Sequence, residues 1–111
     1  MVAFTQQVLD QIVEVIVETV RPEQIYLFGS RGRGESRPDS DLDLLVVERE
    51  PFVAGRSRYE EIDRIQRRIS TFRRAVDVLV YSMDEAKKWG NTTNHVVARA
   101  LREGKLLYER H

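Results

Sequence analysis

Residues 29–44 read GSRGRGESRPDSDLDL. The first part of this segment is rich in Gly, Ser, Arg and Pro, a composition typical of a loop. It is preceded by QIYLF (24–28) and runs into LDLLVV (42–47), and both are rich in residues that favour strands. The second run is almost continuously apolar, as in a strand that is covered on both faces. The sequence therefore predicts a loop that joins two strands of a covered sheet.

Further helices and strands are predicted on both sides of this pair. Apolar residues recur at helical spacing before it and after it, and Pro22 ends the first of these helices. Ser82 and Glu85 have the spacing of a capping box, which marks the start of a short helix. We expect helices over residues 4–20, 58–72, 82–90 and 96–104, and strands over 24–28, 42–47, 75–81 and 105–108. This order predicts an α/β (α+β) fold, in which helices flank a mixed β-sheet.

The length and composition limit the kinds of protein that this chain can be. Its 111 residues suit a single domain over 1–111. Eighteen Lys and Arg balance eighteen Asp and Glu, so the charge balance does not predict a nucleic-acid partner. No apolar run approaches the roughly 20 residues that span a bilayer. The chain has no cysteine, and its N-terminus lacks a signal-peptide pattern, so we expect a cytoplasmic location.

The glycine-rich loop has the features of a phosphate-binding segment. Gly29 and Ser30 follow a predicted strand directly, where backbone N–H groups and the hydroxyl can bind a phosphate. Arg31 and Arg33 can neutralise charge on a polyphosphate. The loop is not a Walker A motif, because no Gly-Lys-Ser/Thr follows. It is not a dinucleotide fingerprint either, because Arg37 stands where the third glycine is needed and a strand follows instead of a helix.

Three aspartates form the predicted reactive site. Asp41 and Asp43 are one residue apart at the start of a strand, so their carboxylates point to the same face. Such a pair repels itself unless a cation is present, and oxygen ligands favour Mg²⁺ or Mn²⁺. Asp77 lies in an otherwise apolar strand, where a carboxylate needs exposure, an arginine such as Arg73 or Arg74, or a metal ion. If the three converge, two ions about 3.5 to 4 Å apart can bind.

These residues resemble the signature of the DNA polymerase β-like nucleotidyltransferase superfamily. Gly-Ser, a spaced glycine and Asp-x-Asp between apolar residues occur in the same order, and Asp77 matches the third carboxylate on a later strand. The short length is most similar to the minimal nucleotidyltransferases (MNT), the antitoxins of HEPN/MNT toxin–antitoxin pairs. This resemblance implies the polymerase β-like fold and transfer of AMP from ATP to a hydroxyl. It also implies that the acceptor is a tyrosine of a HEPN toxin partner.

Two other hypotheses stay open at this stage. The chain can act as a non-catalytic antitoxin that blocks its partner by binding, or as a nucleotidyltransferase that modifies a small molecule or an RNA end. A chain of this length has little surface with which to enclose an acceptor. We therefore expect a partner or a second copy to complete the site. The arginines between residues 56 and 74 suggest RNA or an acidic partner, but the acidic residues among them favour ion pairs on a solvated face. His95 is expected to be structural or at the surface.

Overall fold

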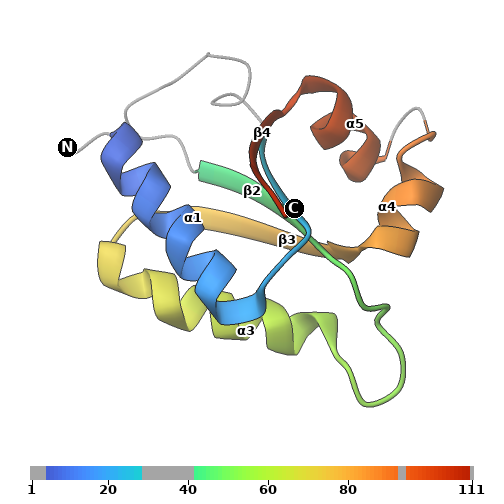
Figure 1. Ribbon diagram of the computed structural model, residues 1–111, viewed down its shortest axis with the longest axis horizontal. Coiled ribbons are helices and arrows are strands. Elements are labelled where there is room, and N and C mark those ends of the chain that lie inside the picture. Colours follow the sequence, from blue (N-terminus) through green and yellow to red (C-terminus); the bar gives the residue numbers. More distant parts are fainter. Residues whose placement is uncertain (1–4, 29–41, 93–94, 111) are drawn as a thin grey trace.

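The computed structural model describes residues 5–28, 42–92 and 95–110 (Figure 1). The helices and strands follow the predicted order and are of the predicted types. They are α1 (Gln6–Val20), β1 (Gln24–Phe28), β2 (Leu42–Glu48), α3 (Arg58–Ile69), the 3₁₀ turn η1 (Ser70–Phe72), β3 (Val76–Ser82), α4 (Met83–Trp89), α5 (Val96–Glu103) and β4 (Lys105–Glu109). The third strand is shifted by one residue from its predicted range, because Ser82 still pairs with Glu48 of β2.

The four strands form one mixed sheet in the order β3-β2-β1-β4. Strand β1 is antiparallel to both of its neighbours, whereas β2 and β3 are parallel. A parallel pair needs a crossover connection, and α3 provides it between β2 and β3. The prediction of a mixed sheet with flanking helices is therefore confirmed.

Both faces of the central strand β2 are buried. Leu44 and Val46 belong to the core that the sheet shares with α1 and α3, which lie side by side in Figure 1. Leu45 and Val47 belong to a smaller core with α4 and α5 on the opposite face. All four side chains are fully buried. This two-sided burial explains why the strand is almost continuously apolar.

The helix ends are stabilised by local hydrogen bonds. The predicted capping box is present: the Glu85 N–H donates to the Ser82 hydroxyl, and the Ser82 N–H donates to the Glu85 carboxylate. Nδ1 of His95 accepts a hydrogen bond from the Val97 N–H at 3.1 Å, so His95 caps α5, and its ring stacks on Trp89. The expected structural role of His95 is confirmed. No helix in the described part of the chain is long and apolar enough to span a bilayer.

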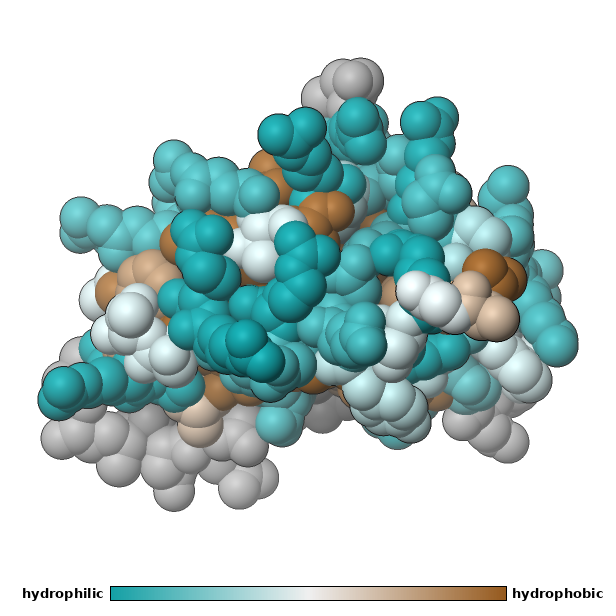
Figure 2. Space-filling view, turned by 90° about the horizontal axis from the view of Figure 1, so that it is seen from below, coloured by the Kyte–Doolittle hydropathy of each residue, from teal (hydrophilic) through white to brown (hydrophobic). Residues whose placement is uncertain are grey.

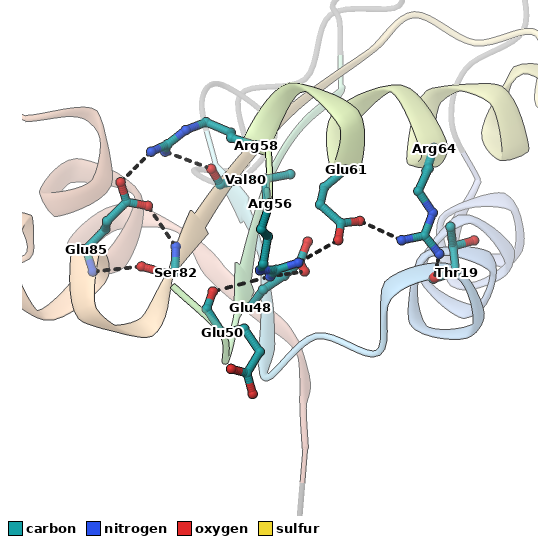
Figure 3. A network of polar contacts seen from close by, with 10 residues as sticks. All are labelled: Thr19, Glu48, Glu50, Arg56, Arg58, Glu61, Arg64, Val80, Ser82 and Glu85. Carbon is teal, nitrogen blue, oxygen red and sulfur yellow. Dashed lines mark hydrogen bonds and ion pairs between the residues drawn. The ribbon is translucent and has the colours of Figure 1, made fainter. Parts of the chain in front are cut away.

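Arg56 holds the end of β2 to the start of α3 (Figure 3). Its guanidinium donates to the buried Glu48 at 2.9 Å, to Glu61 at 2.8 Å and to the Glu50 carbonyl at 3.3 Å. Arg64 donates to the other oxygen of Glu61 at 2.9 Å. Burial raises the Glu48 pKa above its usual value, and the hydrogen bond from Arg56 only partly offsets this. The expected ion pairs among these arginines are therefore present.

Helix α3 also covers the outer edge of β3. Gln66 donates to the Val76 carbonyl at 2.9 Å, and Arg58 donates to the Val80 carbonyl at 3.1 Å. Arg58 pairs in addition with Glu85 of α4. These donors satisfy carbonyl groups that an edge strand would otherwise leave open to another strand.

Candidate active site

Asp43 and Asp77 lie next to each other on neighbouring strands. In the parallel register of β2 and β3, Asp43 is opposite Asp77. Paired positions on adjacent strands are about 4.8 Å apart and direct their side chains to the same face. The strand register therefore places Asp43 beside Asp77, which the sequence alone could not establish.

The pair occupies an open end of one face of the sheet. Asp43 shares its face with Leu45 and Val47, the face that α4 and α5 cover farther along the strands. In Figure 1 α4 lies towards the end of β2 and β3, and α5 contacts β1, whereas Asp43 and Asp77 belong to the beginning of their strands. Asp43 is half-buried and Asp77 is exposed. A ligand can therefore reach the carboxylates from solvent.

Asp77 forms no ion pair or hydrogen bond through its side chain with any residue that the structure describes. Arg74 is one of the two arginines predicted to pair with Asp77 in place of a metal ion. Its guanidinium donates to the Phe72 and Arg73 carbonyls. Asp43 and Asp77 therefore place two carboxylates side by side, and no guanidinium of the described residues binds Asp77. Carboxylate oxygens in this arrangement suit a hard divalent cation. Within residues 5–28, 42–92 and 95–110, no cluster of three His, Cys, Asp or Glu is present.

The remaining predicted site residues lie outside the described part of the chain. They are Gly29, Ser30, Arg31, Arg33 and Asp41. Their place along the chain is nevertheless informative, because the segment 29–41 joins the end of β1 to the start of β2. In the β1–β2 register, Phe28 is opposite Asp43. The segment therefore begins and ends at the same end of the strands as Asp43 and Asp77.

Phe28, near this end of the strands, was not among the residues singled out from the sequence, whereas Gly104 was predicted to end the last helix. Phe28 extends the row of Asp43 and Asp77 onto β1, and the alternation of residues along QIYLF was the signal that places it there. Gly104 ends α5 beside the carbonyl of Leu27. A Cβ atom at this position would lie 2.4 Å from the Ala100 carbonyl oxygen and 2.8 Å from that of Leu27, so a larger residue would require the backbone to shift.

Comparison with protein families identifies the chain. The model described as "Polymerase beta, Nucleotidyltransferase" matches residues 10–111. The chain belongs to the polymerase β nucleotidyltransferase family. This assignment confirms the prediction of an enzyme of the nucleotidyltransferase class. Comparison with curated protein sequences finds no significant match.

Solved structures share the fold of this nucleotidyltransferase domain. A candidate nucleotidyltransferase from Sulfolobus solfataricus is 24% identical with a TM-score of 0.65, over 94% of this chain and 79% of that chain. The MntA–HepT toxin–antitoxin structure is 18% identical with a TM-score of 0.57, over 96% and 74%. A complex of a tri-AMPylated Shewanella oneidensis HEPN toxin with an MNT antitoxin is 19% identical with a TM-score of 0.56, over 95% and 72%. The predicted resemblance to MNT antitoxins is thereby confirmed at the level of the fold.

Proposed function

We propose that this nucleotidyltransferase moves AMP from ATP to a tyrosine hydroxyl of a HEPN-type toxin and so acts as its antitoxin. The observation that carries the proposal is the position of Asp43 opposite Asp77 at the exposed end of two paired strands. The chain that contains them belongs to the polymerase β nucleotidyltransferase family. The likeness in fold to the MNT antitoxin complex with a tri-AMPylated toxin supports the choice of donor and acceptor.

The donor set fits Mg²⁺. Asp43 and Asp77 supply carboxylate oxygens side by side, and Asp41, which lies outside the described residues, is the third carboxylate predicted from the sequence. When bound, Mg²⁺ neutralises charge on the triphosphate and lowers the pKa of a bound hydroxyl. Mn²⁺ has the same preference for oxygen ligands and would replace it.

The residues of the chain have distinct roles in the proposed transfer. Gly29 and Ser30 hold the triphosphate through N–H groups and the hydroxyl, and Arg31 and Arg33 balance its charge. The exposed Asp77 orients the acceptor hydroxyl and draws its proton away. The acceptor oxygen then forms a bond to the α-phosphorus, the bond from this phosphorus to the bridging oxygen breaks, and pyrophosphate leaves.

The openness of the site supports a macromolecular acceptor. In the described part of the chain, α4 and α5 cover the face of the sheet that includes Leu45 and Val47 and leave Asp77 exposed. Sites for small molecules usually bury most of the ligand surface. A protein acceptor brings its own surface to the site, so the partner would complete the enclosure in a hetero-oligomer.

Transfer of label from α-labelled ATP to a co-purified HEPN toxin tests the proposal. We expect labelled toxin with the wild-type chain and Mg²⁺, and loss of labelling by at least about 100-fold with Asp43→Asn or Asp77→Asn. Asp63→Asn is the matched control, because Asp63 forms only an exposed pair with Arg67 and lies on α3.

Intact-mass measurement of the toxin distinguishes the alternatives. A gain of one or more AMP units supports catalysis. An unmodified toxin that is bound tightly, and equally well by the Asp43→Asn variant, would show that the chain acts by occlusion and would overturn the proposal. Labelling of RNA or a small molecule in place of the toxin would leave the enzyme class intact but refute the proposed acceptor.

A further inference from the structure

Tyr59, in the first turn of α3, protrudes from the surface of the molecule. It is 77% exposed, the largest exposed fraction among the large apolar and aromatic side chains that the structure describes. Figure 2 shows the molecule from the side of α3, where hydrophilic residues predominate. The Tyr59 side chain forms no hydrogen bond or ring contact with any residue in the described ranges. Its hydroxyl is therefore accessible to a second molecule.

The other three of the four tyrosines are held within the fold. Tyr26 is half-buried, and burial raises the pKa of its hydroxyl above the usual value. The guanidinium carbon of Arg58 lies 4.8 Å from the centre of the Tyr81 ring. Tyr108 packs against the core that the sheet shares with α1 and α3. Among the tyrosines of the chain, Tyr59 therefore offers the most accessible hydroxyl for a reaction at the protein surface.

The backbone at Tyr59 is fixed, although the side chain is free. The Tyr59 N–H donates to the hydroxyl of Ser57, the N-cap of α3, at 3.2 Å. The preceding residue, Arg58, donates to the Val80 carbonyl at 3.1 Å and pairs with Glu85 (Figure 3). A group on a rigid element loses less conformational entropy on binding than a group on a mobile loop. The start of α3 therefore presents the Tyr59 ring from a defined position.

Tyr59 cannot reach the carboxylates of its own chain. Helix α3 packs on the face of the sheet that α1 also covers, whereas Asp43 and Asp77 belong to the face of α4 and α5. Tyr59 also follows the far end of β2, and this strand runs about 16 Å from Asp43 to Glu48. Any transfer of AMP to Tyr59 therefore requires the site of a second copy.

We propose that a second copy of this chain transfers AMP to the Tyr59 hydroxyl. This inference rests on the proposed function, because it uses the same donor, metal ion and carboxylates with a different tyrosine. The Tyr59 oxygen forms a bond to the α-phosphorus of ATP bound to the second copy, the bond from this phosphorus to the bridging oxygen breaks, and pyrophosphate leaves. The phenolic proton passes to Asp77 of that copy and then to water. Because Asp77 is exposed, a tyrosine that protrudes from a folded surface can approach it.

Intact-mass measurement of the chain incubated alone with ATP and Mg²⁺ tests the inference. We expect the wild type to gain one AMP unit, and peptide mapping should place it on Tyr59. Tyr59→Phe removes the acceptor oxygen but keeps the ring, so the gain should fall at least about tenfold. Tyr81→Phe is the matched control and should be modified like the wild type, because the Tyr81 ring is held beside Arg58.

A mixture of two complementary variants tests whether copies modify each other. Asp43→Asn keeps Tyr59 but lacks a complete site, and Tyr59→Phe keeps the site but lacks the acceptor. AMP should appear on the Asp43→Asn chain only in the mixture. For the wild type alone, raising the concentration about tenfold should raise the initial rate of modification about 100-fold, as for a bimolecular reaction.

The HEPN toxin provides the reference reaction. If the chain labelled the toxin while its own mass stayed unchanged, the inference would be wrong and the proposed function would stand. An equal gain of AMP by Tyr59→Phe would overturn the inference, and a modified fraction that did not depend on concentration would show transfer within one chain and refute it. If neither the toxin nor the chain were modified, the proposed function would fail, and the inference would fail with it.

Discussion

Replacing Arg56 by methionine should strongly destabilise the fold. Arg56 is the hydrogen-bonding partner of two buried carboxylates, those of Glu48 and Glu61. Glu61 would retain Arg64, whereas Glu48 would keep no cation among the described ion pairs. Removing one member of a buried ion pair typically costs about 3 to 5 kcal/mol. For a chain of this size, a loss of about 3 kcal/mol lowers the Tm by roughly 13 °C.

A second variant distinguishes two contributions to the loss of stability: the buried, unpaired charge of Glu48 and the lost packing of the Arg56 side chain. Burial raises the Glu48 pKa despite the hydrogen bond from Arg56, so the ionised carboxylate is already disfavoured there. The double variant Arg56→Met with Glu48→Leu should therefore be more stable than Arg56→Met alone. Thermal unfolding followed by circular dichroism measures both. A Tm decrease below about 3 °C for the single variant, or an equal decrease for the double variant, would refute the reasoning.

Two further predictions concern α4 and α5. Burial disfavours the Glu85 carboxylate, but hydrogen bonds from Arg58 and Ser82 outweigh it and hold the Glu85 pKa below its usual value. The resulting stability is present above the usual pKa of a glutamate and is lost as the pH falls, so Glu85→Gln should flatten the decrease in Tm between about pH 5 and 3. Gly104→Ala would place a Cβ atom 2.4 Å from the Ala100 carbonyl oxygen and 2.8 Å from the Leu27 carbonyl oxygen, and should cost about 1 to 3 kcal/mol, which urea denaturation would measure; an unchanged midpoint would contradict these close approaches.

Local signals made most of the fold predictable. The almost continuously apolar run from Leu42 to Val47 predicted a strand buried on two faces, and the structure places one helical layer on each face. Ser82 and Glu85 marked the start of α4 by their spacing alone. Such features depend on residues within one turn or one strand, so a single sequence contains them.

Features that depend on distant parts of the chain were not predictable. The sequence placed Asp43 and Asp77 on strands but gave no register, because the register is set by pairing between strands that are far apart along the chain. It showed arginines among acidic residues but not that Arg56 reaches back to Glu48 at the end of β2. The position of β4 beside β1 likewise depends on pairing between the two ends of the described chain, as between Gln24 and Glu109.

Calorimetric titration of Mg²⁺ into the chain saturated with a non-hydrolysable ATP analogue tests most directly whether Asp43 and Asp77 form a cation site. The account predicts saturable binding by the wild type, weakened at least about tenfold by Asp43→Asn and by Asp77→Asn, with Asp63→Asn unchanged. Unaltered Mg²⁺ affinity in both of the first two variants, with their folds intact, would contradict it.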